Sequence, residues 1–273
     1  MEELFEEHAN LFNAFHEKVT RPKGAKFHLD RLQMILEKMR EFNDKNKQVN
    51  PTENQERKWK LLERNVFYFQ QLGNWLREMG NLGLAEGNLE KSMAYINELK
   101  IISELNEKEN SKKEEKDKKI KDLEGGVMFY LGSLYKNMGN LPKAEEFYVK
   151  SLKIRQNLFG ENHSDIATSF DNLGSLYKNM GNLTKAEEFY LKSLKIRENL
   201  FGEHHSDVAI SFNNLGSLYN DMGKLTKADL KSLKIWQNLF GEHHSDVALS
   251  SNNLGSLYDD MGRGIFRNLK NFI

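Results

Sequence analysis

The sequence predicts an all-α protein organised as a solenoid of antiparallel helix pairs. Two observations support this prediction. The string LGSLY recurs at Leu131, Leu173, Leu215 and Leu254, so that successive copies are 42, 42 and 39 residues apart. Each of the first three copies is followed by a second apolar segment, and a weaker copy starts upstream at Leu72. Because one such pair cannot bury its apolar faces alone, consecutive pairs are expected to stack on each other.

The composition is that of a globular protein without a strong electrostatic signature. Of the 273 residues 38% are hydrophobic, and 40 basic residues balance 40 acidic ones. A neutral chain lacks the basic surface typical of nucleic-acid binders. The absence of cysteine excludes disulfides, thiolate metal sites and a cysteine nucleophile. No apolar stretch reaches the roughly 20 residues of a membrane span, and the acidic start is unlike a secretory signal. We therefore expect a cytoplasmic protein that does not bind membranes.

Each repeat begins with a helix, called helix A. Ser206 is the expected N-cap in the third full copy. The apolar residues Val208, Phe212 and Leu215 follow at the three-to-four spacing of one helical face. Gly223 is expected to end the helix, since glycine readily adopts the left-handed conformation found past helix ends.

A second helix, helix B, completes each repeat. Thr184 and Glu187 have the spacing of a capping box, and Pro142 lies at the equivalent place in the preceding copy, near a helix start where its missing N–H matters little. Helix B is expected to stop at Gly202.

Two small residues predict where the helices of one pair cross closely. Gly174 in helix A and Ala186 in helix B lie 12 positions apart. A larger side chain at either place is expected to push the helices apart, and such overpacking costs about 1–3 kcal/mol.

The repeat pattern divides the chain into five regions. Residues 1–50 form an N-terminal helical region, with helices expected at 2–18 and 27–43, that would cap one end of the stack. The other regions are a degenerate first repeat (51–105), a charged linker or helix extension (106–124), the main array with an incomplete last unit (125–262), and a C-terminal tail (263–273).

Two regions depart from the regular repeat. Residues 106–124 are a mixed-charge run, which favours a solvated loop or a helix extension. A tail that binds an anionic partner is the alternative, and the interleaved acidic residues disfavour it. The third full unit lacks three residues of helix B at Lys227–Leu233. Because three residues rotate a helix by about 300°, we expect a shortened or bent helix there.

The repeat residues resemble the tetratricopeptide consensus at Leu173, Gly174, Tyr177, Ala186 and Tyr190. The 42-residue period and the segment LKIRENLFGEHHSDVA are similar to the kinesin-light-chain variety. The resemblance implies a right-handed superhelix, whose A helices line a concave groove that binds a peptide or helix of another protein. Serine stands where that variety usually has proline, and no coiled coil of light-chain length is present.

Histidine recurs beside serine and aspartate once per repeat, at His163, at His204 and His205, and at His243 and His244. His and Asp are metal-ligand types, and Ser, His and Asp form hydrolase triads. However, ligands must lie near 2 Å from one ion, whereas successive repeats are separated by about 10 Å. A triad also needs residues that converge on one nucleophile. Helix capping is therefore the favoured interpretation.

The resemblance implies which residues face the groove. They lie three residues before the repeat glycine and one, four and five residues after it. They are Phe129, Ser133, Lys136, Asn137, Asp171, Ser175, Lys178, Asn179, Asn213, Ser217, Asn220, Asp221, Asn252, Ser256, Asp259 and Asp260. The charge changes from lysine to aspartate along this set, which favours a partner peptide with one acidic and one basic end.

The predicted function is a non-enzymatic scaffold or adaptor that binds a protein partner without a cofactor, metal or nucleic acid. Two alternatives remain open at this point. The chain could be a fragment or sensing region of a larger multidomain protein of the same repeat type. Less favoured is a metal-dependent enzyme that uses the repeated His and Asp residues.

Overall fold

The computed structural model describes residues 51–105, 110–222, 234, 237 and 238. The elements assigned within these residues are seven α-helices. They are α3 (Pro51–Glu78), α4 (Leu82–Leu105), α5 (Asn110–Asn137), α6 (Leu141–Phe159), α7 (Ser164–Asn179), α8 (Leu183–Phe201) and α9 (Ser206–Asp221). The chain divides into two compact units, Met1–Lys58 and Trp59–Ile273. The helix packing described below is that of the second unit.

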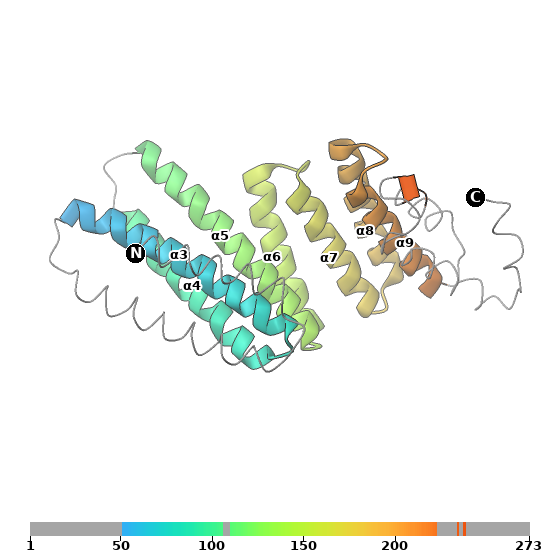
Figure 1. Cartoon of the computed structure of the whole chain (residues 1–273), viewed down its shortest axis with the longest axis horizontal. Helices are drawn as coiled ribbons and strands as arrows, with labels where there is room; N and C mark the ends of the chain where they lie inside the picture. Colours follow the sequence, from blue (N-terminus) through green and yellow to red (C-terminus); the bar gives the residue numbers. More distant parts are fainter. Residues whose placement is uncertain (1–50, 106–109, 223–233, 235–236, 239–273) are drawn as a thin grey trace, which may run out of the picture. The chain divides into compact units, whose positions relative to one another are not determined.

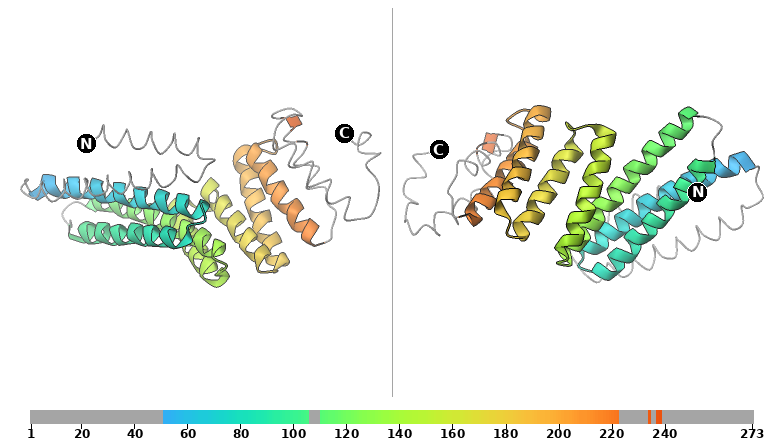
Figure 2. Two further views of the ribbon diagram at one scale, coloured as in Figure 1. Left: turned by 60° about the horizontal axis from the view of Figure 1, so that its bottom comes forward. Right: turned by 180° about the vertical axis from the view of Figure 1, so that it is seen from behind.

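The helices of this unit are arranged as successive antiparallel pairs (Figures 1 and 2). The pairs α3/α4, α5/α6 and α7/α8 are helices A and B of three repeats, and α9 is helix A of the next. Each helix from α4 to α8 packs against the one that follows it in the sequence. This arrangement confirms the predicted all-α solenoid of stacked helix pairs.

The core repeats with the sequence, because equivalent apolar residues of successive copies are buried. Leu131, Leu173 and Leu215 are at most 4% exposed, and Ala144 and Ala186 are fully buried. Equivalent serines of helix B also connect the two helices of a pair: Ser92 Oγ donates to Val66 O at 2.8 Å, and Ser151 Oγ donates to Gly125 O at 2.7 Å. These bonds satisfy the buried hydroxyls, which would otherwise destabilise the core.

A glycine and a tyrosine form the close crossing inside the full repeats. A Cβ added at Gly174 would lie 2.7 Å from Tyr190 Cδ1, and one added at Gly132 would lie 2.6 Å from Tyr148 Cδ1. The predicted glycine is therefore correct, but its nearest partner is Tyr190, not Ala186. The reason is that helical side chains lean toward the N-terminus of their helix, so the ring of Tyr190 covers the turn that contains Ala186.

Both predicted N-caps are displaced by a residue or two. His205 is the N-cap of α9, and its Nδ1 accepts a hydrogen bond from the N–H of Asp207 at 3.1 Å. Asn182 is the N-cap of α8, and its Oδ1 accepts from the N–H three residues later at 3.2 Å. The predictions of Ser206 and Thr184 were wrong because α9 begins at Ser206 and α8 begins at Leu183. Both residues therefore lie inside their helix, whereas an N-cap precedes it. At the other end of helix B, Gly202 is the C-cap of α8 with φ +80°, as predicted.

The charged run is helical from Asn110 onward and continues without a break into helix A of the next repeat, forming α5. Its added turns pack against α3 and α4. Ile120 is only 3% exposed, Lys119 Nζ lies 3.1 Å from Glu63 Oε1, and Ser103 Oγ donates to Asp117 at 2.6 Å. The long helices α3, α4 and α5 therefore pack together as a group of three, which Figure 1 shows in blue to green.

Several predictions lie outside the described residues. They concern the helices at 2–18 and 27–43, the end of helix A at Gly223, the shortened helix at Lys227–Leu233, the last repeat and the tail at 263–273. Among the helices that the structure does describe, none combines the length and the apolar character that a membrane-crossing segment needs.

Candidate partner-binding site

The A helices α5, α7 and α9 carry polar residues at the positions one, four and five residues after the repeat glycine. In the described part of the chain this A-helix row consists of Ser133, Lys136, Asn137, Ser175, Lys178, Asn179, Ser217, Asn220 and Asp221. Lys136 Nζ donates to Ser175 Oγ at 2.6 Å, and Lys178 Nζ donates to Ser217 Oγ at 2.7 Å. Each of these bonds joins one helix A to the next, so the structure brings these predicted residues of successive repeats together.

The charges of the row pair with each other. Lys178 Nζ lies 3.1 Å from Asp221 Oδ2, and the two side chains are 22% and 45% exposed. The sequence suggested that lysine and aspartate would serve opposite ends of a partner. In the structure the lysine of α7 and the aspartate of α9 already neutralise one another, so a partner would have to compete with this ion pair.

Lys136 is a partly buried lysine of the row. Burial lowers the pKa of Lys136, and the positive charge of Arg77 lowers it further. Arg77 occupies the equivalent position in α3, where its guanidinium donates to Asn74 Oδ1 at 2.8 Å. Arg77 of α3 is therefore close enough to Lys136 of α5 for its charge to lower the pKa of that lysine.

Ser133 faces the interior of its own repeat. It is 9% exposed, and its hydroxyl shares a 2.9 Å hydrogen bond with the hydroxyl of Tyr148. The first residue of the row in α5 therefore binds helix B of the same pair, and Ser175 and Ser217 accept hydrogen bonds from lysines of the preceding repeats.

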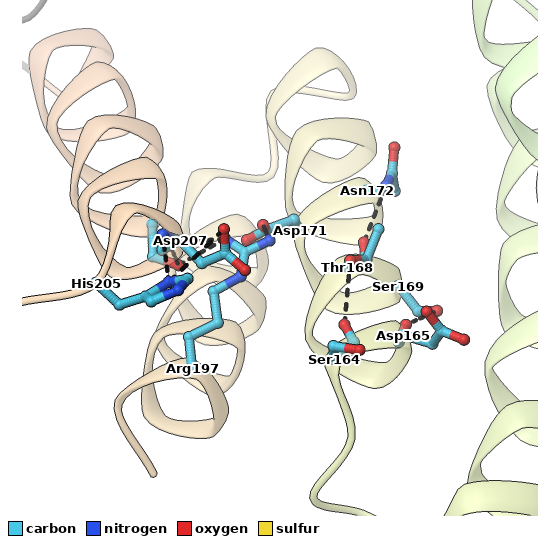
Figure 3. A network of polar contacts seen from close by, with 10 residues as sticks. Ser164, Asp165, Thr168, Ser169, Asp171, Asn172, Arg197, His205 and Asp207 are labelled. Atoms are coloured by element: carbon cyan, nitrogen blue, oxygen red, sulfur yellow. Dashed lines mark hydrogen bonds and ion pairs between the residues drawn. The ribbon is translucent and has the colours of Figure 1, made fainter. Parts of the chain in front are cut away.

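The position three residues before the repeat glycine contacts an arginine of helix B in two repeats. Arg155 lies over the ring of Phe129, with Cζ 4.7 Å from the ring centroid. Arg197 forms an ion pair with Asp171, with NH2 2.7 Å from Oδ2, and Figure 3 shows the two side chains pointing toward one another. The same arginine position is therefore matched to a ring in one repeat and to a carboxylate in the next.

The Asp171–Arg197 pair is buried and connects three helices. The two side chains are 12% and 9% exposed. Burial raises the pKa of Asp171, and the guanidinium of Arg197 opposes that rise. Arg197 NH1 also donates to Ser211 Oγ at 2.8 Å and to Asp207 O at 3.2 Å. Arg197 therefore links α7, α8 and α9, so that Asp171 is held inside the stack.

A second set of contacts between repeats was not predicted. In each of three copies, the tyrosine three residues after the repeat glycine donates its hydroxyl to a glutamate in helix B of the preceding repeat. The pairs are Tyr135–Glu86 at 2.6 Å, Tyr177–Glu145, and Tyr219–Glu187 at 2.7 Å. The pKa of each tyrosine is raised to about 12, in Tyr135 first by the hydrogen bond to the carboxylate and then by burial, and in Tyr177 and Tyr219 first by burial and then by that hydrogen bond. The signal in the sequence is that both residues recur at fixed repeat positions, with the glutamate directly after the buried alanine.

Two of the repeated histidines, His163 and His205, act as helix caps, whereas His204 is an exposed turn residue. His163 Nδ1 accepts from the N–H of Asp165 at 3.2 Å, and His205 does the same with Asp207. Each ring also stacks on a phenylalanine at 4.5 Å between centroids. Among the described residues no group of three or more His, Cys, Asp or Glu side chains is arranged to hold a metal ion. The predicted residues Asn252, Ser256, Asp259 and Asp260 lie outside the described part.

The family model of the tetratricopeptide repeat matches the chain at residues 126–181 and 165–230. These matches include the last part of α5, from residue 126 onward, and all of α6, α7, α8 and α9. Residues 126–230 of the chain are tetratricopeptide repeats.

Solved structures place these tetratricopeptide repeats with the kinesin-light-chain-like kind. BtubC (BKLC) from P. vanneervenii is 26% identical, and the match covers 76% of this chain and 84% of that chain with a TM-score of 0.52. The putative kinesin light chain of Podosopora anserina with nearly identical TPR-like repeats is 16% identical, with 74% and 88% covered and a TM-score of 0.55. A second structure of that protein, with one substitution, gives a TM-score of 0.56. A comparison with curated proteins found no match.

The tetratricopeptide repeats of residues 126–230 support a general function. Repeats of this type generally serve protein–protein interaction, because a solenoid presents an extended surface. They are generally not enzymes. His163 and His205 cap helices, and Asp171 pairs with an arginine that connects repeats.

Proposed function

We propose that this tetratricopeptide-repeat protein is a non-enzymatic scaffold that binds a peptide or helix of a partner protein along the A-helix row. The observation that supports the proposal is the pair of lysine–serine bonds, Lys136 to Ser175 and Lys178 to Ser217. Because each bond joins neighbouring A helices, the row is one polar surface that crosses at least three repeats.

The chemistry of the row suits an extended peptide. Asn137, Asn179, Ser217 and Asp221 are exposed, and amide and hydroxyl side chains both donate and accept hydrogen bonds. The backbone of a bound peptide offers N–H and C=O groups at regular intervals, which such side chains recognise in peptide-binding grooves. A short peptide held by a few such contacts is expected to bind with micromolar affinity, or about −8 kcal/mol.

The charges of the row give the bound peptide a direction. Lys136 and Lys178 lie toward the α5 side and Asp221 lies at α9, so an acidic end of the peptide would bind near α5 and a basic end near α9. A carboxylate of the peptide would replace Asp221 at Lys178, and a basic side chain of the peptide would then bind the released Asp221. This exchange keeps every charge paired, which limits the desolvation cost of binding.

A charge-reversal experiment tests the proposal. Partners are first identified by affinity purification of the intact chain and mass spectrometry. Binding of the identified partner is then measured for Lys136→Glu/Lys178→Glu and for the control Lys150→Glu/Lys192→Glu. The control makes the same change of charge in two successive repeats, on exposed lysines of α6 and α8 that each form an ion pair one helical turn away.

The two double variants are expected to differ. Reversal in the A-helix row should weaken the partner at least tenfold, whereas the helix B control should bind as the unmodified chain does. Circular dichroism verifies that both variants stay helical. Retention of the partner by a folded row variant, or equal loss in both variants, would show that the partner binds elsewhere.

We also propose that the scaffold acts in the cytoplasm. A chain of 273 residues without cysteine suits a reducing compartment, where disulfides contribute nothing to stability. Cell fractionation with an antibody against the untagged protein measures this directly, and recovery in a secreted or membrane fraction would contradict it.

A further inference from the structure

Two histidines cap the helices that begin consecutive repeats. His163 starts α7 and His205 starts α9, directly after helix B of the preceding repeat. Their Nδ1 atoms accept hydrogen bonds from the N–H groups of Asp165 and Asp207 at 3.2 and 3.1 Å. Each cap therefore lies at a joint between repeats.

The ring of each histidine is held in place by the end of helix B. His163 stacks on Phe159 and His205 stacks on Phe201, with centroids 4.5 Å apart and planes within 18° and 22° of parallel. The ring orientation that directs Nδ1 at the helix N-terminus is thus also the one that packs on the preceding repeat. Loss of the cap and loss of this packing are therefore linked.

The hydrogen bond requires a neutral imidazole. Nδ1 accepts only while it carries no proton, so the neutral ring must carry its proton on Nε2. Protonation of Nδ1 would turn two donors toward each other at the start of a helix, where the helix dipole already disfavours a positive charge. We infer that His163 and His205 are acid-sensitive caps, which loosen the joints between repeats when their imidazoles become protonated.

The neighbouring charges act in both directions. Asp165 Oδ2 and Asp207 Oδ1 lie 3.9 Å from the respective Nδ1 atoms and favour the imidazolium. Helix B contributes the opposite charge, since Arg197 NH1 donates to Asp207 O at 3.2 Å and Arg155 interacts electrostatically with Asp165. In the turns themselves Glu161 is bound by Gln156, and Glu203 and His204 are exposed.

The backbone hydrogen bonds of the two rings are shorter than their contacts with the aspartates. Both aspartates lie 3.9 Å from Nδ1, beyond hydrogen-bond distance, and are 46% and 39% exposed, so water screens their attraction. The backbone donors lie at hydrogen-bond distance and cannot move away without unwinding the helix start. The stabilising contribution of each cap is therefore present while the imidazole is neutral and is lost when the imidazole becomes protonated.

Three forms of the full chain test this inference: the natural chain, His163→Asn/His205→Asn and His163→Ala/His205→Ala. Asparagine is a strong N-cap that does not titrate, whereas alanine is a poor one. The midpoint of thermal unfolding is measured for each near pH 7.5 and near pH 5.5. At the higher pH the unfolding midpoint of the natural chain should be close to that of the Asn variant. At the lower pH its midpoint should fall toward that of the Ala variant, by about 2–4 °C per cap.

Because the variants differ from the natural chain only at these two positions, the other histidines cancel in the comparison. The inference would be overturned if the difference in unfolding midpoint between the natural chain and the Asn variant were the same at both pH values. It would also be overturned if the natural chain gained stability relative to the Asn variant at the lower pH. Nitrogen-15 NMR of the imidazoles in the natural chain is a second readout that needs no variant. It should show the Nε2–H tautomer at neutral pH. After protonation the Asp165 and Asp207 amides should be less protected from hydrogen exchange, relative to the intrinsic exchange rate at the same pH, and a different neutral tautomer would also overturn the inference.

Discussion

Lys178 of α7 forms an ion pair with Asp221 of α9, with Nζ 3.1 Å from Oδ2, and the same ammonium donates to Ser217 Oγ at 2.7 Å. One lysine therefore spans two successive A helices. The A-helix row is held together across repeats by the same groups that we propose to bind a partner. Binding and the stacking of repeats are thus expected to be coupled at this residue.

A charge swap measures how much this ion pair contributes to stability. Because Asp221 is 45% exposed, the pair should contribute only about 0–1 kcal/mol to the free energy of unfolding. Lys178→Glu and Asp221→Lys should each lower that free energy slightly, and the double variant should recover the loss. Denaturant unfolding of the four forms gives the coupling energy. A double variant that is as unstable as the sum of the singles would show that the ion pair does not contribute.

The buried pair Asp171–Arg197 should behave differently from the exposed one. Arg197→Met leaves the carboxylate of Asp171 without its guanidinium in a site where both side chains are at most 12% exposed, which typically costs about 3–5 kcal/mol. The double variant Asp171→Leu/Arg197→Met removes both charges and should lose less. Arg155→Met is the matched control, because Arg155 lies over the ring of Phe129 and such a contact contributes about 0.5–2 kcal/mol. Equal losses of unfolding free energy for the two single arginine variants would contradict this interpretation.

The fold could be predicted because the same residues recur at the same spacing. Four copies of one string indicate stacked helix pairs, and the apolar face of helix A predicted the buried residues Val208, Phe212 and Leu215, which are at most 8% exposed. Gly174 was recognised as a close crossing for the same reason. These features depend on local spacing, which a sequence displays directly.

Contacts between repeats could not be predicted to the same extent. The hydrogen bond of Tyr177 to Glu145 joins residues 32 positions apart, and that of Lys178 to Ser217 joins residues 39 apart. Which of several polar residues meet depends on the rotation of one helix pair against the next, and local spacing does not display that rotation. For that reason the lysines were predicted as groove residues but not as partners of the following repeat.

The close crossing at Gly174 predicts opposite effects for two glycine substitutions. Gly174→Ala places a Cβ 2.7 Å from the ring of Tyr190 and should lower the free energy of unfolding by about 1–3 kcal/mol. Gly87 lies in α4, and no atom lies within 4 Å of a Cβ added there by Gly87→Ala. It should raise that free energy by about 0.5–1 kcal/mol, because alanine favours the helix. Chemical denaturation of both variants measures the difference, and a stabilised Gly174→Ala would mean that the ring moves aside at little cost.

The tyrosine–glutamate pairs predict a loss of stability at alkaline pH. Tyr135, Tyr177 and Tyr219 have pKa values of about 12 in the folded chain, against about 10 in an unfolded chain. Between these values the unfolded state loses protons that the folded state keeps, so the free energy of unfolding falls as the pH rises from about 10 to 12. The triple tyrosine-to-phenylalanine variant should show a flatter dependence over this range.

Absorbance at about 295 nm, which reports tyrosinate formation, follows the titration, and denaturant midpoints at several pH values follow the stability. The single variant Tyr130→Phe is a suitable control, because Tyr130 is not among the tyrosines paired with a helix B glutamate. It should keep the slope of the natural chain. If the triple variant also kept that slope, the hydroxyl–carboxylate bonds between repeats would contribute nothing to the alkaline transition.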